Sequence, residues 1–110
     1  MILLYLGIPP ILHRINFEEV VKVKDGKSIN LTVEILSDLP LTGKLTWSRI
    51  DEPLSSKDIV RNFTVDDHIY TSLGIFNVSF ANDSGNYSLT AQNRCGKSSL
   101  TVYIDVEGIH

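Results

Sequence analysis

Apolar and polar residues alternate with a period of two along most of this 110-residue chain. The clearest stretch is 28–36, where Ile29, Leu31, Val33 and Ile35 share one face and polar residues occupy the other. This alternation is typical of a β-strand with one face on a core and one in water, because successive side chains point to opposite faces. No window of about eleven or more residues favours the helical period. The sequence therefore predicts an all-β fold.

The remaining runs with β character are short and are separated by turn residues at intervals of roughly ten residues. They are Val20–Lys24, Lys44–Ile50, Ile59–Val65, Ile69–Val78, Asn86–Gln92 and Ser98–Val106. The turn segments are Asp25–Gly26, Asp38–Gly43, Asp51–Ser56, Asn82–Gly85 and Asn93–Gly96. Asp25–Gly26 is also a hairpin signal between the runs on either side of it. The pattern predicts a two-sheet antiparallel Greek-key β-sandwich of seven or eight strands.

Composition indicates one globular domain. Hydrophobic residues make up 43% of the chain and charged residues 21%, and a chain of this length can bury a core of its own. We expect the domain at residues 9–107, after a linker or vector-derived start at 1–8 and before a tail at 108–110. The apolar start lacks a basic region and a small-residue cleavage site, which argues against a signal peptide, and no run is long enough to insert into a membrane. The net charge of −3 argues against nucleic acid as a partner.

The chemistry-bearing residues are few. Cys95 is the one cysteine, so neither an intrachain disulfide nor a cysteine-rich zinc site can form. Cys95 is predicted to lie in an exposed turn, far in sequence from any histidine that could act as its base. His68 follows Asp66 and Asp67, a grouping typical of a solvated loop rather than of a metal site. We therefore expect no enzyme, no catalytic residue, no cofactor, no metal and no small-molecule substrate.

Three features together resemble an immunoglobulin domain of the I-set branch over about residues 9 to 107. They are Gly26-x-x-Ile29-x-Leu31-x-Val33, Trp47, and Asp83-Ser84-Gly85-Asn86-Tyr87-Ser88-Leu89. Immunoglobulin sandwiches carry a buried tryptophan, a disulfide between strands B and F, and a tyrosine two residues before the second cysteine. Ala91-x-Asn93-x-x-Gly96 resembles the I-set F–G hairpin, although fibronectin type III modules share that piece.

The resemblance implies a structural core and one ion pair. The implied core residues are Val33, Trp47, Leu73, Ile75, Tyr87 and Leu89, and the implied ion pair joins Arg61 to Asp83. Val33 and Leu89 occupy the two cysteine positions, so the inter-sheet disulfide is absent. A disulfide closing a loop of about 56 residues would contribute on the order of 4 kcal/mol. Burying each aliphatic side chain returns roughly 1.5–3 kcal/mol, so the fold is expected to form without the disulfide.

As an immunoglobulin domain without this disulfide, the chain resembles the domains of the titin and twitchin family of giant muscle proteins. Pro9–Pro10 and Leu73-x-Ile75 also resemble that group. The resemblance implies a cytoplasmic, sarcomeric spacer and docking domain. Its expected partners are neighbouring immunoglobulin or fibronectin domains and filament proteins. A reducing compartment agrees with a free surface thiol and no disulfide.

Glycosylation sequons favour an alternative function. Five of the seven asparagines begin an Asn-x-Ser/Thr sequence, namely Asn30, Asn62, Asn77, Asn82 and Asn86. If these sites are used, the chain is an extracellular domain of an adhesion molecule or receptor. The sequons also have an explanation that involves no glycan. Polar residues recur two places apart on the solvent face of a strand, which raises the rate at which Asn-x-Ser/Thr occurs by chance.

Overall fold

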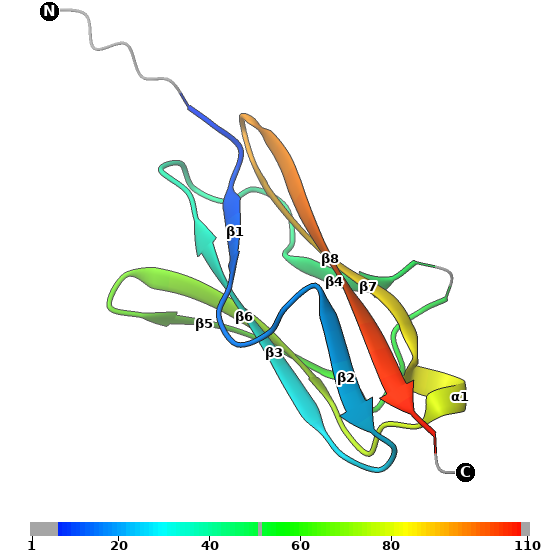
Figure 1. Cartoon of the computed structure of the whole chain (residues 1–110). Helices are drawn as coiled ribbons and strands as arrows, with labels where there is room; N and C mark the ends of the chain where they lie inside the picture. The colour runs from blue at the N-terminus through cyan, green and yellow to red at the C-terminus, as the bar shows by residue number, and fades with distance from the viewer. Residues whose placement is uncertain (1–6, 51, 109–110) are drawn as a thin grey trace, which may run out of the picture.

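The alternating runs form the strands of a sandwich, which the computed structural model describes for residues 7–50 and 52–108 (Figure 1). Most of the predicted start at 1–8 and tail at 108–110 lies outside the described residues. The described residues form eight strands and one short helix. The strands are β1 (Ile11–Arg14), β2 (Val20–Lys24), β3 (Ile29–Leu36), β4 (Thr46–Arg49), β5 (Ile59–Val65), β6 (His68–Ile75), β7 (Gly85–Asn93) and β8 (Gly96–Glu107), and the helix is α1 (Phe80–Asp83).

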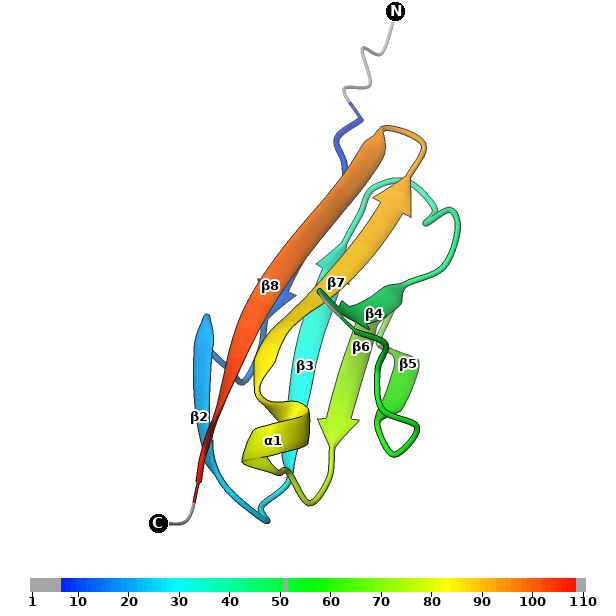
Figure 2. The ribbon, with the colours of Figure 1, turned by 90° about the vertical axis from the view of Figure 1, so that its right-hand side faces the viewer.

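Two four-stranded sheets face each other across the core (Figure 2). One has the order β1-β3-β6-β5 and the other the order β2-β8-β7-β4. The predicted all-β sandwich without an inter-sheet disulfide is thereby confirmed. In β3 and β6 the register places Leu31 opposite Leu73 and Val33 opposite Thr71, so the inward faces of the two strands align.

The pairing departs from the sequence prediction in one place. β2 runs parallel to β8, with Val20 beside Tyr103 and Lys24 beside Glu107, so the sandwich is not wholly antiparallel. Asp25–Gly26 therefore does not close the predicted hairpin, since β2 and β3 belong to different sheets. The turn instead contacts the segment after β6, where the Gly26 N–H donates to the Val78 carbonyl at 2.7 Å. A two-residue turn signal fixes a local bend and does not decide which sheet each flanking strand joins.

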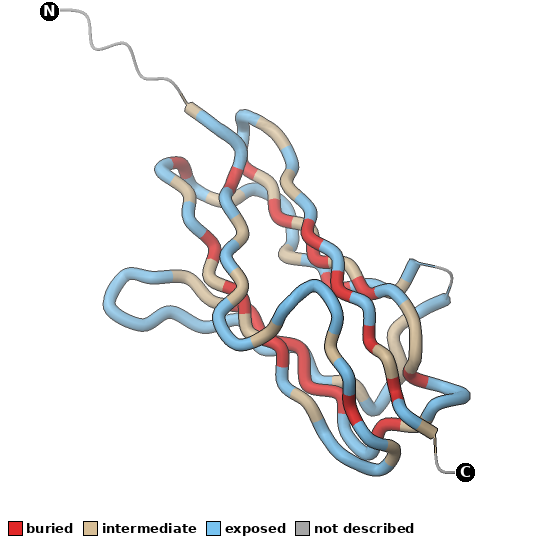
Figure 3. Tube along the Cα trace, in the orientation of Figure 1, coloured by how far each residue is buried: buried red, intermediate tan, exposed pale blue. Residues whose placement is uncertain are grey.

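The core lies between the sheets, and β5 is left outside it (Figure 3). β3, β7 and β8 alternate buried and less buried residues, as the period of two predicts. The buried apolar residues that form one cluster are Val23, Leu31, Val33, Ile35, Trp47, Leu73, Ile75, Val78, Tyr87, Leu89, Ala91, Leu100, Val102, Ile104 and Val106. All seven residues of β5 are exposed.

A single helical turn precedes β7, where the sequence predicts only a turn. The side chain of Ser79 caps α1 by accepting from the Asn82 N–H at 3.1 Å. The helix is too short for its period to appear in the sequence. Within the described residues, no helix has the length and apolar character needed to span a membrane.

Candidate functional site

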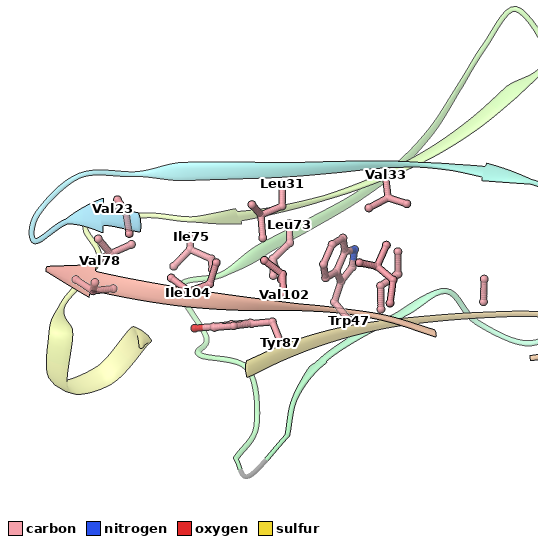
Figure 4. Packing of buried hydrophobic residues seen from close by; sticks show 14 of the residues in the cluster. Val23, Leu31, Val33, Trp47, Leu73, Ile75, Val78, Tyr87, Val102 and Ile104 are labelled. Carbon is pink, nitrogen blue, oxygen red and sulfur yellow. The ribbon is translucent and has the colours of Figure 1, made fainter. Parts of the chain in front are cut away.

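The resemblance to immunoglobulin domains assigns the two positions of the inter-sheet disulfide to Val33 and Leu89, which carry aliphatic side chains. Val33 on β3 and Leu89 on β7 are both fully buried, and Trp47 on β4 lies beside Leu89 in the register. Figure 4 shows Val33 projecting from β3 into the layer that contains the Trp47 ring. Apolar packing therefore holds the two sheets together where a covalent bond would otherwise lie.

A hydrogen-bonded chain crosses the sandwich beside this packing. The Trp47 Nε1–H donates to Thr71 Oγ1 at 3.0 Å, and the Thr71 hydroxyl donates to Asn62 Oδ1 at 2.6 Å. The chain connects β4 in one sheet to β6 and β5 in the other. Sequence analysis missed Thr71, although it is in phase with the inward-facing Leu73 and Ile75. A polar residue in phase with a buried face was the available signal, because a buried hydroxyl needs a partner.

Tyr87, the tyrosine of the Asp-x-Gly-x-Tyr motif, packs in the core near α1. Tyr87 is fully buried, and its hydroxyl donates to the Asp83 carbonyl at 2.8 Å. Burial raises the pKa of Tyr87 to about 12, and nearby Arg49 opposes this rise. The phenol therefore stays neutral and keeps its role as a donor at any physiological pH.

The Asp83 carboxylate is paired with Lys57, and the predicted ion pair with Arg61 is wrong. Asp83 is fully buried, and its Oδ2 accepts from Lys57 Nζ at 2.9 Å and from the Ser79 N–H at 2.8 Å. Arg61 stands opposite Ser72 in the register, on the face of β5 that alternates away from the core. Its side chain therefore leaves the sheet on the side opposite Asp83. Lys57, in the loop before β5, approaches from the α1 end.

Asp58 follows this lysine and lies in the same charged environment. Burial, with a further contribution from the Asp83 carboxylate, raises the pKa of Asp58 above its ordinary value. The Ser55 N–H, donating to Asp58 Oδ2 at 3.2 Å, and the Lys57 charge oppose the rise. The Oδ1 atoms of Asp58 and Asp83 are both buried without a hydrogen-bond partner among the described residues. The loop before β5 is thus held to the buried Asp83 carboxylate by Lys57, and the charges of Lys57 and Arg49 both act on Asp58.

Arg49 is a second basic residue at this corner, and sequence analysis did not identify it. Its guanidinium donates to the carbonyls of Asn82 at 2.5 Å and Ser84 at 2.7 Å, which lie at the end of α1. The same group lies 5.0 Å from the centre of the Tyr87 ring and 2.8 Å from Glu52. A cation at the C-terminus of a helix satisfies carbonyls that lack intrahelical partners. No sequence pattern marks this role, because the contact joins residues far apart in the chain.

The chain leading into β1 is fixed to the turn between β7 and β8. The buried Asn93 amide donates to the Ile8 carbonyl at 2.8 Å and to Ser37 Oγ at 3.0 Å. Its Oδ1 accepts from the Cys95 N–H at 2.8 Å. Gly96 has φ of +149°, and a Cβ there would lie 3.2 Å from Pro9 Cγ, so both geometry and space favour glycine. Cys95 is a free, exposed thiol in this turn.

All five sequon asparagines are exposed, but several of these residues also have structural roles. Asn62 accepts from Thr71 in the hydrogen-bonded chain described above. Asn77 has a positive φ of 48°, a conformation in which asparagine is favoured. Ser79 of one sequon caps α1, and Ser84 of another accepts from the Val106 N–H at 3.3 Å. The fold accounts for these residue types independently of any glycan. The exposed sequon asparagines are Asn30, Asn62, Asn77, Asn82 and Asn86.

The titratable side chains of the surface are dispersed. His68 lies against Glu34, with 2.5 Å between Nδ1 and Oε2, and His13 lies 3.7 Å from the same carboxylate on its other side. His110 and Asp51 fall outside the described residues. Among the residues that are described, no three histidine, cysteine or acidic side chains are placed to hold a metal ion. A hollow of about 190 Å³ opens between Ile59 and Phe76 on the outer face of the β5 sheet.

The chain belongs to the immunoglobulin I-set family. The family model for the immunoglobulin I-set domain matches residues 14–106, which is most of the chain. This match agrees with the two-sheet topology and with the tyrosine and tryptophan positions. Immunoglobulin folds are generally non-catalytic, and nothing in the described site points to enzymatic activity.

The structure is similar to immunoglobulin domains of titin and of other proteins. It resembles the titin tandem domains A164–A165 with a TM-score of 0.72 at 18% identity, covering 94% of this chain and 51% of that one. It resembles titin domains Z1Z2, solved with telethonin, with a TM-score of 0.70 at 24% identity, covering 96% and 51%. It resembles the structure of Dpr2 Ig1–Ig2 in complex with DIP-Theta Ig1–Ig3 with a TM-score of 0.74 at 18% identity, covering 92% and 33%. This chain spans about half of the two titin chains and a third of the Dpr2 complex chain, and at these identities the likeness shows the fold.

Proposed function

We propose that this domain is a mechanical spacer and docking module of an intracellular muscle filament protein of the titin and twitchin kind. The observation that carries the proposal is the fully buried pair Val33 and Leu89 at the disulfide position. A domain whose sheets are held together without a disulfide keeps its stability in a reducing compartment, where a disulfide would not persist. The free, exposed thiol of Cys95 agrees with the same compartment.

The placement of the two ends supports a role in transmitting tension. Asn93 fixes the incoming chain at Ile8 to the β7–β8 turn, whereas β8 ends at the opposite end of the sandwich (Figure 1). A force applied between the ends therefore runs along the strands. In this geometry the parallel pairing of β2 with β8, from Val20–Tyr103 to Lys24–Glu107, is loaded lengthwise. Hydrogen bonds loaded lengthwise share the force, so the pair resists separation as a unit.

The proposed partners are neighbouring immunoglobulin or fibronectin domains and filament proteins. Solved relatives support protein partners, since one titin structure contains telethonin and one contains an obscurin-like immunoglobulin domain. Telethonin and the obscurin-like domain are partners of those titin domains. For this chain the prediction is general: contacts are made by strand edges and loops rather than by a closed pocket.

The location of the native full-length protein tests the proposal. An antibody against this domain should give striated staining along filaments in permeabilised muscle and none on intact cells. Staining of intact, unpermeabilised cells would overturn the proposal. Mechanical unfolding of the domain between its termini gives a second test, because the lengthwise loading of β2 and β8 predicts a higher unfolding force than pulling those strands apart from one end.

A second candidate function is an extracellular adhesion or receptor domain. Exposure of all five sequon asparagines is the observation that favours it. Treatment of the native protein with an endoglycosidase that removes N-linked glycans distinguishes the two. A loss of mass supports the extracellular candidate, and an unchanged mass together with filament staining supports the muscle protein.

A further inference from the structure

The edge strand β5 is the longest unpaired edge of the sandwich. It has seven residues, whereas the other three edges, β1, β2 and β4, have four, five and four. All seven residues of β5 are exposed, and Arg61 is the one charged residue among them. Ile59, Val60, Phe63 and Val65 are each 40–50% exposed. In Figure 1 the β5–β6 hairpin extends away from the rest of the sandwich.

Such an edge needs an explanation. Edge strands present unpaired backbone groups, and monomeric proteins usually protect them with lysines, prolines, bulges or short length. β5 has no proline, no lysine and no glycine, and it pairs with β6 in an uninterrupted register from Ile59–Gly74 to Val65–His68. Apart from the charge of Arg61, none of these protective devices is present in this strand.

The hairpin geometry identifies which backbone groups face outward. Asp66 and Asp67 both have positive φ, 49° and 65°, which defines a two-residue turn closed by Val65 and His68. The closing pair of such a turn is hydrogen-bonded, and hydrogen-bonded pairs alternate along an antiparallel ladder. The N–H and C=O groups of Val60, Asn62 and Thr64 therefore point away from β6 and are available to another strand.

The sequence of β5 is complementary to itself about Asn62. In an antiparallel pair of two copies centred on this residue, Ile59 lies opposite Val65 and Arg61 lies opposite Phe63 on the outer face. The two pairs are an apolar contact and a cation–π contact, and both types stabilise neighbouring strands. A centre at Arg61 would set two arginines opposite each other, and a centre at Phe63 would leave Ile59 unpaired. The Asn62 centre alone pairs the whole strand without a like-charge contact.

We propose that β5 is a self-association edge, through which a second copy of this chain adds in antiparallel orientation about a two-fold axis at Asn62. The outward groups of Val60, Asn62 and Thr64 supply the backbone hydrogen bonds, and the two β5 sheets become one continuous sheet. A two-fold pairing of this kind closes on itself and does not propagate. A single strand pair buries less surface than a stable dimer usually needs, so the association is weak and is favoured where copies are concentrated.

Sedimentation velocity over micromolar to millimolar concentrations tests the proposal. The domain should pass from monomer to dimer, with no larger species. Thr64→Pro removes an outward N–H without removing a bond to β6, since an edge proline with its nitrogen facing solvent is tolerated. It should weaken dimerisation by about tenfold or more, because the two-fold axis removes the same bond twice. Thr64→Val, which keeps the N–H, is the matched control and should dimerise as the unaltered domain does.

Register-specific crosslinking gives a readout that does not depend on the proline variant folding. In a Cys95→Ser background, Arg61→Cys and Phe63→Cys proteins are mixed under mild oxidation. Residues 61 and 63 of opposite copies form a non-hydrogen-bonded pair with Cα atoms about 4.5 Å apart, within disulfide range. The mixture should give a mixed disulfide much faster than either protein gives its own. A monomer at all concentrations, unaltered dimerisation of a folded Thr64→Pro domain, or equal homo- and heterocrosslinking would each overturn the proposal.

Discussion

Lys57 Nζ lies 2.9 Å from Asp83 Oδ2, and this contact holds the loop before β5 against the fully buried carboxylate of the motif aspartate. Replacing Lys57 with methionine keeps most of the side-chain volume and removes the charge. The buried carboxylate then loses its cation, so we expect a loss of about 1–2 kcal/mol in the free energy of unfolding. This value lies below that of a fully buried pair because the Lys57 side chain is 38% exposed. Urea denaturation at neutral pH measures it.

Arg61→Met is the matched control for the lysine substitution. Arg61 is an exposed strand residue that does not contact Asp83, so its loss should change the stability by less than about 0.5 kcal/mol. The reverse order, with Arg61→Met the more destabilising variant, would contradict the assignment of Lys57 as the partner of Asp83.

Val33 and Leu89 can be tested as the positions of the missing disulfide. In a Cys95→Ser background, Val33→Cys with Leu89→Cys should form a disulfide on oxidation, because these positions resemble those that carry it in related domains. Closing a loop of about 56 residues contributes on the order of 4 kcal/mol, and the lost aliphatic burial reduces the net gain to roughly 2 kcal/mol. Denaturation of the oxidised double variant and of the parent measures the net gain, and denaturation of the oxidised and reduced double variant measures the contribution of the crosslink.

The single substitutions serve as controls for the disulfide. Val33→Cys and Leu89→Cys should each be less stable than the parent under oxidising and reducing conditions alike, since neither can form the crosslink. Failure of the double variant to oxidise while folded would show that β3 and β7 do not face each other at these residues, and would contradict the correspondence with the disulfide positions.

The sequence predicts the strands well because their information is local. The alternation at Leu31 and Val33 reports burial directly, and the spacing of Trp47 and Tyr87 supports the family resemblance. The partner of Asp83 depends on which face of β5 an arginine occupies and on how the preceding loop returns, which alternation alone does not fix. Arg49 at the end of α1 was missed for the same reason, because its contacts are made across about 33 residues of chain. Contacts between segments distant in sequence were therefore beyond prediction, whereas the positions of all strands but β1 were not.

Thr71 lies at the centre of the hydrogen-bonded chain between Trp47 and Asn62, and its hydroxyl can be removed without changing the side-chain shape. Thr71→Val leaves the Trp47 N–H buried without an acceptor and Asn62 Oδ1 without its donor. We expect a loss of about 1–3 kcal/mol in the free energy of unfolding, the usual cost of an unsatisfied buried polar group. Thr71→Ser keeps the hydroxyl and should retain the hydrogen bonds, so it should be the more stable of the two. Thermal melts compare them, and equal stability of the valine variant with the parent would contradict a structural role for the chain.

Tyr87 predicts a loss of stability at alkaline pH. Its pKa rises from 10.0 to about 12 on folding because burial disfavours the phenolate. Between these values the unfolded chain releases the proton while the folded domain retains it, so the free energy of unfolding falls as pH rises through this range, by at most about 3 kcal/mol. Tyr87→Phe loses the hydrogen bond to the Asp83 carbonyl and should be about 1–2 kcal/mol less stable than the parent at neutral pH. The variant has no phenol to titrate, so the gap should narrow or reverse toward pH 12. Chemical denaturation of both proteins at neutral and alkaline pH measures this, and a gap independent of pH would show that the buried phenol does not resist ionisation.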